Sequence, residues 1–202
     1  MNRPTLLHRW LRPFLLALAT LSLASCGINS VPTAQEEVKA KWGDVQANFQ
    51  RRANLVDNLV ATVKAAAAHE ESTLRGVTEA RAKATSVQVN AADLGDPAKI
   101  AQFAQAQGAL SQSLGRLLAT VEAYPNLKAN ENFLTLQSQL EGTENRIAVS
   151  IRDYNEAVRA YNTQVRTFPT MIGAKIRGAE VMAPYQAATP GAEVAPKVNF
   201  GT

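Results

Sequence analysis

The stretch that decides the fold runs from Asn130 to Phe168 and reads NENFLTLQSQLEGTENRIAVSIRDYNEAVRAYNTQVRTF. Its apolar residues are spaced mainly three and four apart, which is the period of a helix packed against other helices. One seven-residue gap interrupts this pattern, and Thr143 stands there in place of an apolar residue. The remaining positions are polar, as is typical of a long helix in a bundle. The apolar stripe consists of Phe133, Leu136, Leu140, Ile147, Ile151, Tyr154, Val158, Tyr161, Val165 and Phe168.

Two features of this stretch leave alternatives open. Gly142 lies inside the helix, at a cost of about 1 kcal/mol relative to alanine, and it precedes Thr143. A local kink, a close helix crossing or a buried polar contact would each explain the pair. Two further series repeat at seven-residue intervals and indicate either a partner-binding ridge or a solvated face. These series are Arg152, Arg159 and Arg166, and Asn155 and Asn162.

A second long helix is predicted near the amino terminus. Thr33 followed by Glu36 is a capping-box pattern that predicts a helix start, and apolar residues then keep helical spacing to about residue 84. The alanine-rich stretch 65–72 offers few side chains for packing. Helix propensity nevertheless favours one continuous helix through it, and a kink or a full turn at this place is the alternative.

The segments together define a fold class. A polar connection at 86–95 is followed by Asp96 and Pro97, which predict the cap and first residue of another helix. The sequence therefore predicts an all-α fold, an antiparallel bundle of three to four long helices over residues 33–168. Helical patterns of this length are also typical of coiled coils. We expect residues 169–202 to form a short amphipathic segment and an extended tail.

This carboxyl-terminal region carries two separate predictions. Met171–Ile176 is a short apolar segment that includes Lys175, and it would either touch lipid or cap the bundle end. Further on, Val194, Val198 and Phe200 have strand-like spacing. They predict an extended segment docked on the bundle or on a partner, and a frayed terminus is the alternative.

The first 25 residues have the pattern of a secretory signal peptide. Three arginines precede a short apolar run at 14–24, which is too short for an ordinary membrane-spanning helix. The run ends in Leu-Ala-Ser-Cys, which resembles the bacterial lipobox. We therefore expect a lipoprotein signal peptide at 1–25, a lipid on Cys26 and a tether at 26–32. An uncleaved anchor or a plain secreted protein is the alternative.

The charge of the chain argues against nucleic-acid binding. The whole sequence has a formal charge of +4, and residues 1–25 contain three arginines and no acidic residue, so removing them leaves +1. A nearly neutral domain lacks the basic surface that nucleic-acid binding requires. Cys26 is the only cysteine, so an internal disulfide is excluded.

The sequence offers little catalytic or metal-binding chemistry. His69, the single histidine after the leader, is followed by Glu70, but Thr73 occupies the position where a zinc-protease motif requires a second histidine. One histidine and no internal cysteine do not build an ordinary structural zinc site. We therefore expect no enzyme activity, no metal and no cofactor. The alternative is an enzyme or small-ligand binder that uses Glu141, Glu144 and Asp153 in an interhelical cleft.

Several blocks of the chain resemble the LemA family of bacterial envelope proteins, and together they cover nearly all of it after the leader. The blocks are RRANLVDNLV at 51–60, AHE at 68–70, VTEARA at 77–82, VEAYPNLKANENF at 121–133, LEGTENRIA at 140–148, DYNEAV at 153–158 and the segment 161–169. The resemblance implies a membrane-attached, antiparallel bundle of about four helices, and hence a break near His69. It implies no established enzymatic activity. The lipobox and the segment 170–174 depart from the family's pattern.

These observations lead to one functional expectation. The chain is expected to be a membrane-anchored, non-catalytic envelope lipoprotein, an adaptor or scaffold that presents a helical surface to a protein partner in the envelope. The lipid on Cys26 would hold it outside the cytoplasmic membrane, or on the periplasmic side of the outer membrane in a Gram-negative cell.

Overall fold

The prediction of an all-helical protein is confirmed by the computed structural model, which describes residues 6–67 and 69–187. No strand occurs in these two ranges. The elements in chain order are α1 (Leu6–Ala66), α2 (Glu71–Ser86), the short 3-10 helix η1 (Ala91–Asp93), α3 (Pro97–Val121), α4 (Pro125–Lys128), α5 (Glu131–Arg166) and α6 (Thr170–Ile176).

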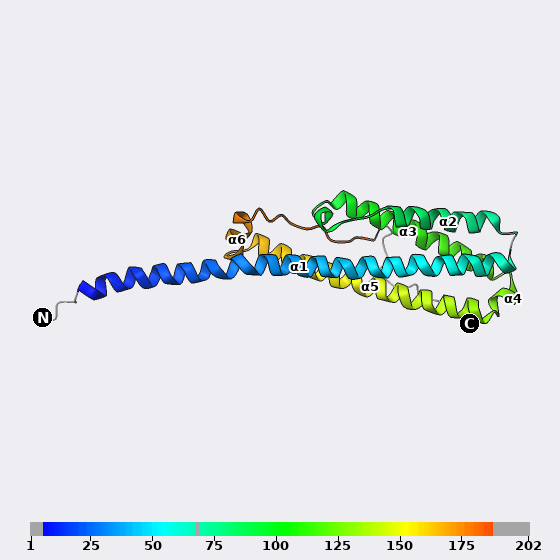
Figure 1. Cartoon of the computed structure of the whole chain (residues 1–202), viewed down its shortest axis with the longest axis horizontal. Coiled ribbons are helices and arrows are strands. Elements are labelled where there is room, and N and C mark those ends of the chain that lie inside the picture. The colour runs from blue at the N-terminus through cyan, green and yellow to red at the C-terminus, as the bar shows by residue number, and fades with distance from the viewer. Residues whose placement is uncertain (1–5, 68, 188–202) are drawn as a thin grey trace, which may run out of the picture.

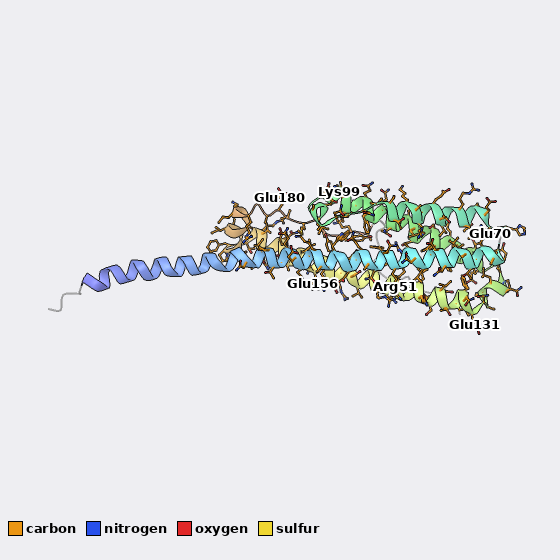
Figure 2. The ribbon with its side chains drawn as sticks, in the orientation of Figure 1. Arg51, Glu70, Lys99, Glu131, Glu156 and Glu180 are labelled. Carbon is orange, nitrogen blue, oxygen red and sulfur yellow. The ribbon has the colours of Figure 1, made fainter. Side chains whose placement is uncertain are left out.

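The long helices lie lengthwise beside one another (Figure 1). The most extensive contact joins α1 to α5, and the next joins α2 to α3. One end of the molecule holds the α1–α2 connection and α4. At the other end α6 packs on α1, and the first part of α1 projects beyond the remaining helices. Figure 2 shows Glu70 and Glu131 near the first end and Glu180 toward the second.

The predicted start of α3 is confirmed by its cap, and α5 begins with a second cap of the same kind. The side chain of Asp96 accepts hydrogen bonds from the backbone N–H groups of Ala98 and Lys99, and Pro97 is the first residue of α3. Asn130 caps α5 in the same way, accepting from the N–H groups two and three residues ahead. Both helices therefore begin where a side-chain oxygen satisfies otherwise unpaired donors.

The continuous first helix predicted from propensity is wrong, and the break near His69 implied by the family resemblance is confirmed. Helix α1 ends at Ala66 and α2 begins at Glu71. The turn is held by the Tyr124 hydroxyl, which donates to Glu70 Oε1 at 2.8 Å. Reversal of the chain buries Leu74 and Val77 in the core. A straight helix would have carried them beyond the bundle, so tertiary burial overrides propensity here.

The predicted helix start at Thr33 is also wrong. Helix α1 runs without interruption through 26–32, so this segment is not an extended tether in the structure. The Thr33 hydroxyl donates to the Asn29 carbonyl at 2.9 Å, which is the bond of a residue inside a helix. Val31, only 1% exposed, already packs in the core. The end of the leader at residue 25 stays a prediction.

The core consists of two clusters of buried residues, one behind the other along the bundle. The cluster that includes residues of the extended segment after α6 is rich in aromatic residues, and we call it the strap-side cluster. The cluster nearer the turn between α1 and α2 is mainly aliphatic, and we call it the turn-side cluster. The strap-side cluster includes Val31, Val38, Trp42, Val45, Phe49, Val89, Leu94, Ile100, Phe103, Ile147, Tyr154, Val158, Tyr161, Ala174, Met182 and Tyr185. The turn-side cluster includes Val56, Leu59, Val63, Leu74, Val77, Leu110, Leu114, Leu117, Val121, Leu127, Phe133 and Leu140. Phe168, predicted for the apolar stripe of α5, is instead 72% exposed because α5 ends before it.

The segment after α6 is extended, as predicted, but it is packed on the bundle rather than loose. We call residues 179–187 the strap, which Figure 1 shows running back from α6 along the bundle. Met182, Ala183 and Tyr185 are buried, and the Ala183 N–H donates to the Leu94 carbonyl at 2.8 Å. The docking predicted for Val194, Val198 and Phe200 falls outside the described residues and stays a prediction.

Candidate functional site

A buried arginine lies between the two core clusters. Arg52, on α1, is 1% exposed, and its guanidinium contacts both α3 and α5. Its Nη1 donates to Ser111 Oγ at 2.8 Å and to Glu144 Oε1 at 3.1 Å. Its Nη2 donates to the carbonyl and to Oε1 of Gln107, at 3.1 and 2.6 Å. Its Cζ also lies 4.9 Å from the ring centroid of Phe49. A buried charge with this many partners ties three helices together.

We call Arg52, Gln107, Ser111 and Glu144 the polar layer. Gln107 is 5% exposed and donates from Nε2 to the Ala84 carbonyl at 3.2 Å, so the end of α2 joins the same network. The Glu144 side chain is 42% exposed, so the carboxylate remains hydrated on one side. A buried cation opposite a half-exposed acid favours one helix register, since any slip leaves the guanidinium unpaired.

The polar layer is reflected in the sequence, but only when the apolar stripes of the three long helices are compared with one another. Each long helix that lines it has one seven-residue gap in its apolar stripe at this level. The gaps are Phe49–Val56, Phe103–Leu110 and Leu140–Ile147, and they contain Arg52, Gln107 and Glu144. One gap alone is a common irregularity. Gaps on three predicted helices of a bundle would have indicated a shared polar level.

Thr143 resolves one of the alternatives for α5. It is 0% exposed, and its hydroxyl donates to the Gln139 carbonyl at 2.8 Å while Arg146 Nη2 donates to it at 3.4 Å. A Cβ added at Gly142 would meet only the end of the Arg146 side chain, at 3.9 Å. The pair therefore reflects a buried polar contact rather than a close helix crossing.

Asn155 and Asn162, interpreted as part of a ridge or a solvated face, instead bind the strap. Asn155 donates from Nδ2 to the Tyr185 carbonyl at 2.9 Å and accepts from the Tyr185 N–H at 2.8 Å. Asn162 makes the same pair of bonds to Met182, both at 2.8 Å. Each amide thus pairs with a backbone unit as a neighbouring strand would. We call these four bonds the amide ladder.

Two tyrosines on the same helix extend the amide ladder. The Tyr154 hydroxyl donates to the Ala183 carbonyl at 2.8 Å, and the Tyr161 hydroxyl donates to the Glu180 carbonyl at 2.9 Å. Burial raises the pKa of both phenols, and it raises the pKa of Tyr185 to about 12. These tyrosines are therefore neutral donors and packing groups at physiological pH, not bases.

The arginines of the seven-residue series lie on the solvent side of α5. Arg152, Arg159 and Arg166 are all exposed. Arg152 lies 3.7 Å from Asp153 on the same helix, and the described residues provide no ion-pair partner for the other two. This exposed face is available for contact, whereas the asparagines of the other series are occupied by the strap.

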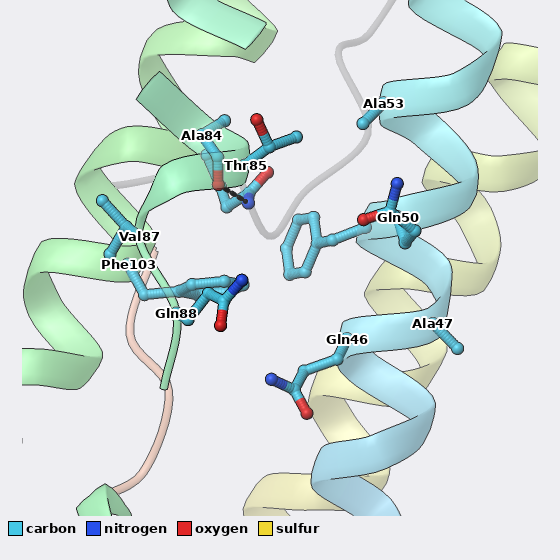
Figure 3. Close-up of a pocket in the computed structure, with 11 residues that line it drawn as sticks. Gln46, Ala47, Gln50, Ala53, Ala84, Thr85, Val87, Gln88 and Phe103 are labelled. Atoms are coloured by element: carbon cyan, nitrogen blue, oxygen red, sulfur yellow. Dashed lines mark hydrogen bonds between the residues drawn. The ribbon is translucent and has the colours of Figure 1, made fainter. Parts of the chain in front are cut away.

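The carboxylates predicted for a ligand-binding cleft do not converge. Glu144 belongs to the polar layer, Glu141 accepts from Gln137 at 3.2 Å, and Asp153 lies beside Arg152. None of the three lines the pocket of about 380 Å³ that lies between α1 and the α2–α3 junction. Figure 3 shows Gln46 and Gln50 on one side of this pocket and Thr85, Val87 and Phe103 across from them. Its lining contains no titratable side chain, so it offers no general base to activate a hydroxyl such as that of Thr85.

In residues 6–67 and 69–187 no three potential metal ligands come together. No helix there combines the length and the hydropathy of a membrane span. Cys26, the predicted lipidation site, lies within α1.

Comparison with known proteins gives a family and three relatives. The LemA family model matches residues 41–200, a range that includes the polar layer, the amide ladder and the strap. The magnetosome proteins MamQ 1 and MamQ 2 of Paramagnetospirillum magneticum are each 29% identical over 145 residues, covering 64% of this chain and 53% of the relative. The chain thus spans about half of their length. MamQ of Magnetospirillum gryphiswaldense is 27% identical over 186 residues, covering 81% of this chain and 68% of that protein.

Proposed function

This chain belongs to the LemA family, and we propose on that premise that it is a membrane-anchored, non-catalytic lipoprotein of the bacterial envelope. Its helices would form an antiparallel bundle that serves as an adaptor or scaffold for other envelope proteins. A lipid on Cys26 would hold the bundle outside the cytoplasmic membrane, or at the periplasmic side of the outer membrane in a Gram-negative cell. Relatives named as magnetosome proteins support a bacterial setting.

The observation that carries the proposal is the course of α1. This single helix contains Cys26 and packs in the core at Val31. At a rise of 1.5 Å per residue, five residues place the packed Val31 about 8 Å from the lipidated position. A bundle held by so short and regular a connection lies against the membrane. It would present the sides of its helices to neighbouring envelope proteins.

The interior of the bundle supports a structural role rather than catalysis. The buried polar groups of the polar layer and the amide ladder are bonded mainly to one another and to backbone. Groups used in this way fix helix register and hold the strap, and they leave no reactive pair facing a pocket. The exposed arginines of α5 would then contribute to the surface that a partner protein contacts.

The anchor is tested by mass spectrometry of the amino-terminal peptide from membrane fractions. We expect a peptide that begins at Cys26 and carries acyl chains. Cys26→Ala should abolish this peptide, whereas Ser25→Ala, which keeps a small residue before the cysteine, should retain it. An unmodified amino terminus in the wild type, with membrane attachment unchanged in Cys26→Ala, would exclude lipid anchoring.

The adaptor role is tested by crosslinking in cells. A photo-crosslinking amino acid at Arg159, on the exposed face of α5, should capture a defined envelope protein identified by mass spectrometry. The same group at Leu134, near the opposite end of α5, is the matched control. Equal, unspecific capture at both positions would contradict a partner-binding face on this part of the helix.

A further inference from the structure

Exposed apolar side chains gather around α6. Among residues 29–65, 67 and 69–187, whose side chains the structure describes, six large apolar side chains are exposed, and four of them lie between Phe168 and Val181. They are Phe168, Ile172, Ile176 and Val181, of which Phe168 and Ile176 are 72% and 75% exposed. Solvent exposure of so much apolar surface in one short segment marks a contact site.

Basic residues flank the same segment. Arg166, Lys175 and Arg177 are exposed, and none of them pairs with a carboxylate of the described chain. Between residues 166 and 181 the only acid is Glu180. Residues 1–35 contain no acid at all, and Glu36 and Glu37, the first two, are paired with Lys39 and Lys41. This end of the molecule is therefore positively charged.

The position of α6 identifies what would cover it. Its Ala174 packs in the strap-side cluster with Val31, and Arg177 shares a pocket of about 360 Å³ with Val31 and Pro32. Val31 follows Cys26, the proposed lipidation site, by five residues. Figure 1 shows α6 at the end of the bundle from which α1 projects. An apolar segment with flanking cations, placed beside the start of the chain, matches the surface of an anionic bilayer.

We infer that Phe168–Arg177 forms a membrane-contact surface on anionic phospholipid headgroups, beside the attached part of α1. The inference rests on the proposed attachment through Cys26. Phe168, Ile172 and Ile176 enter the headgroup–acyl boundary, and Arg166, Lys175 and Arg177 lie at the phosphates. This second contact fixes the bundle's orientation, which a lipid anchor alone would leave undetermined, and it therefore decides which helix faces are presented to partners.

The test uses the full, lipidated chain with an environment-sensitive fluorescent amino acid at residue 176 or, as a control, at residue 134. The chain is bound to vesicles of phosphatidylethanolamine and phosphatidylglycerol that contain brominated phospholipid as quencher. We expect strong quenching at 176 and none at 134, where Leu134 is also exposed but lies toward the opposite end. Flotation of the same vesicles measures attachment independently.

Charge reversal provides the matched comparison. Lys175→Glu with Arg177→Glu should lower contact at 176 by roughly fivefold per cation, and only in vesicles that contain phosphatidylglycerol. Arg51→Glu with Arg116→Glu, two exposed cations outside this surface, should leave the quenching unchanged. A chain that floats with the vesicles but shows equal quenching at 176 and 134 overturns the inference and leaves the proposed attachment standing. A chain that does not float overturns both.

Discussion

The two core clusters are built on different principles. In the turn-side cluster, aliphatic side chains from α1, α2, α3 and α5 pack at helical spacing. In the strap-side cluster an irregular segment lies among the helices, and side-chain hydrogen bonds to its backbone hold it there. The polar layer separates the two. Apolar residues at helical spacing are thus sufficient to form a core where only helices pack against one another. An extended segment buried against helices requires polar side chains that satisfy its backbone groups.

The largest expected effect lies in the turn-side cluster. Leu117 is 0% exposed, and Leu117→Ala removes packing that no hydrogen bond replaces. We expect the free energy of unfolding to fall by about 3 kcal/mol, within the range for leucine truncation in a core. Leu134→Ala, at a 49% exposed position, should change it by less than about 0.5 kcal/mol. Denaturant unfolding measures both, and equal losses would contradict this description of the cluster.

The polar layer should be nearly as sensitive. Arg52→Ala leaves Gln107 without its guanidinium partner and opens a cavity between the clusters. We expect a loss of about 2–3 kcal/mol in unfolding free energy. Arg51→Ala, at the exposed neighbouring position, is the control and should be nearly neutral. If Arg52→Ala were as mild as Arg51→Ala, the network would not hold the three helices in register.

Removal of the amide ladder should affect the strap-side cluster selectively. Asn155→Ala with Asn162→Ala eliminates four hydrogen bonds to the strap. Because both asparagines are only half-buried, water can replace part of what is lost, and we expect about 2 kcal/mol in total. Asn132→Ala with Asn145→Ala tests exposed asparagines of the same helix. Thermal unfolding compares the two double variants. Identical melting curves would contradict a stabilising role for the amide ladder.

The last expected effect is absent at neutral pH and appears only at alkaline pH. Burial raises the pKa of Tyr185 to about 12, while an unfolded tyrosine ionises near 10. The folded state therefore favours the neutral phenol. Its contribution is complete below pH 10 and is lost as the pH rises toward 12. Between pH 9 and 11.5 the wild type should lose roughly 2 kcal/mol more stability than Tyr185→Phe. If the stabilities of the wild type and Tyr185→Phe fell in parallel as the pH rises, the Tyr185 phenol would not be buried in solution.

The sequence predicted the regular parts of the molecule well. Asp96 was identified as a cap because a capping side chain acts on N–H groups two and three residues away, whereas Asn130, which caps α5 in the same way, was not predicted as a cap. The stripe of α5 was also recognised, since it reflects one helix and its own period. The break after Ala66 was missed by propensity, because burial of Leu74 and Val77 against α3 is a tertiary effect.

The candidate site was far less predictable. Asn155 bonds to Tyr185, thirty residues away, and the strap that it holds has no period of its own. On a helix viewed in isolation, Asn155 and Asn162 look the same as solvated residues. Arg52 was likewise hidden, because its importance depends on residues of two other helices at the same level. The break near His69 was predicted by the family resemblance, whereas helix propensity predicted a continuous helix.

Amide hydrogen exchange of Met182 and Tyr185 in the full chain tests the difference between the two clusters most directly. Both N–H groups should be strongly protected in the wild type, because Asn162 and Asn155 accept from them. Asn155→Ala should make the Tyr185 amide exchange at least tenfold faster while amides inside α3 keep their rates, and Asn155→Asp, which retains an acceptor, should preserve much of the protection. Fast exchange of both amides in the wild type, or exchange unaffected by Asn155→Ala, would contradict a strap held by the amide ladder.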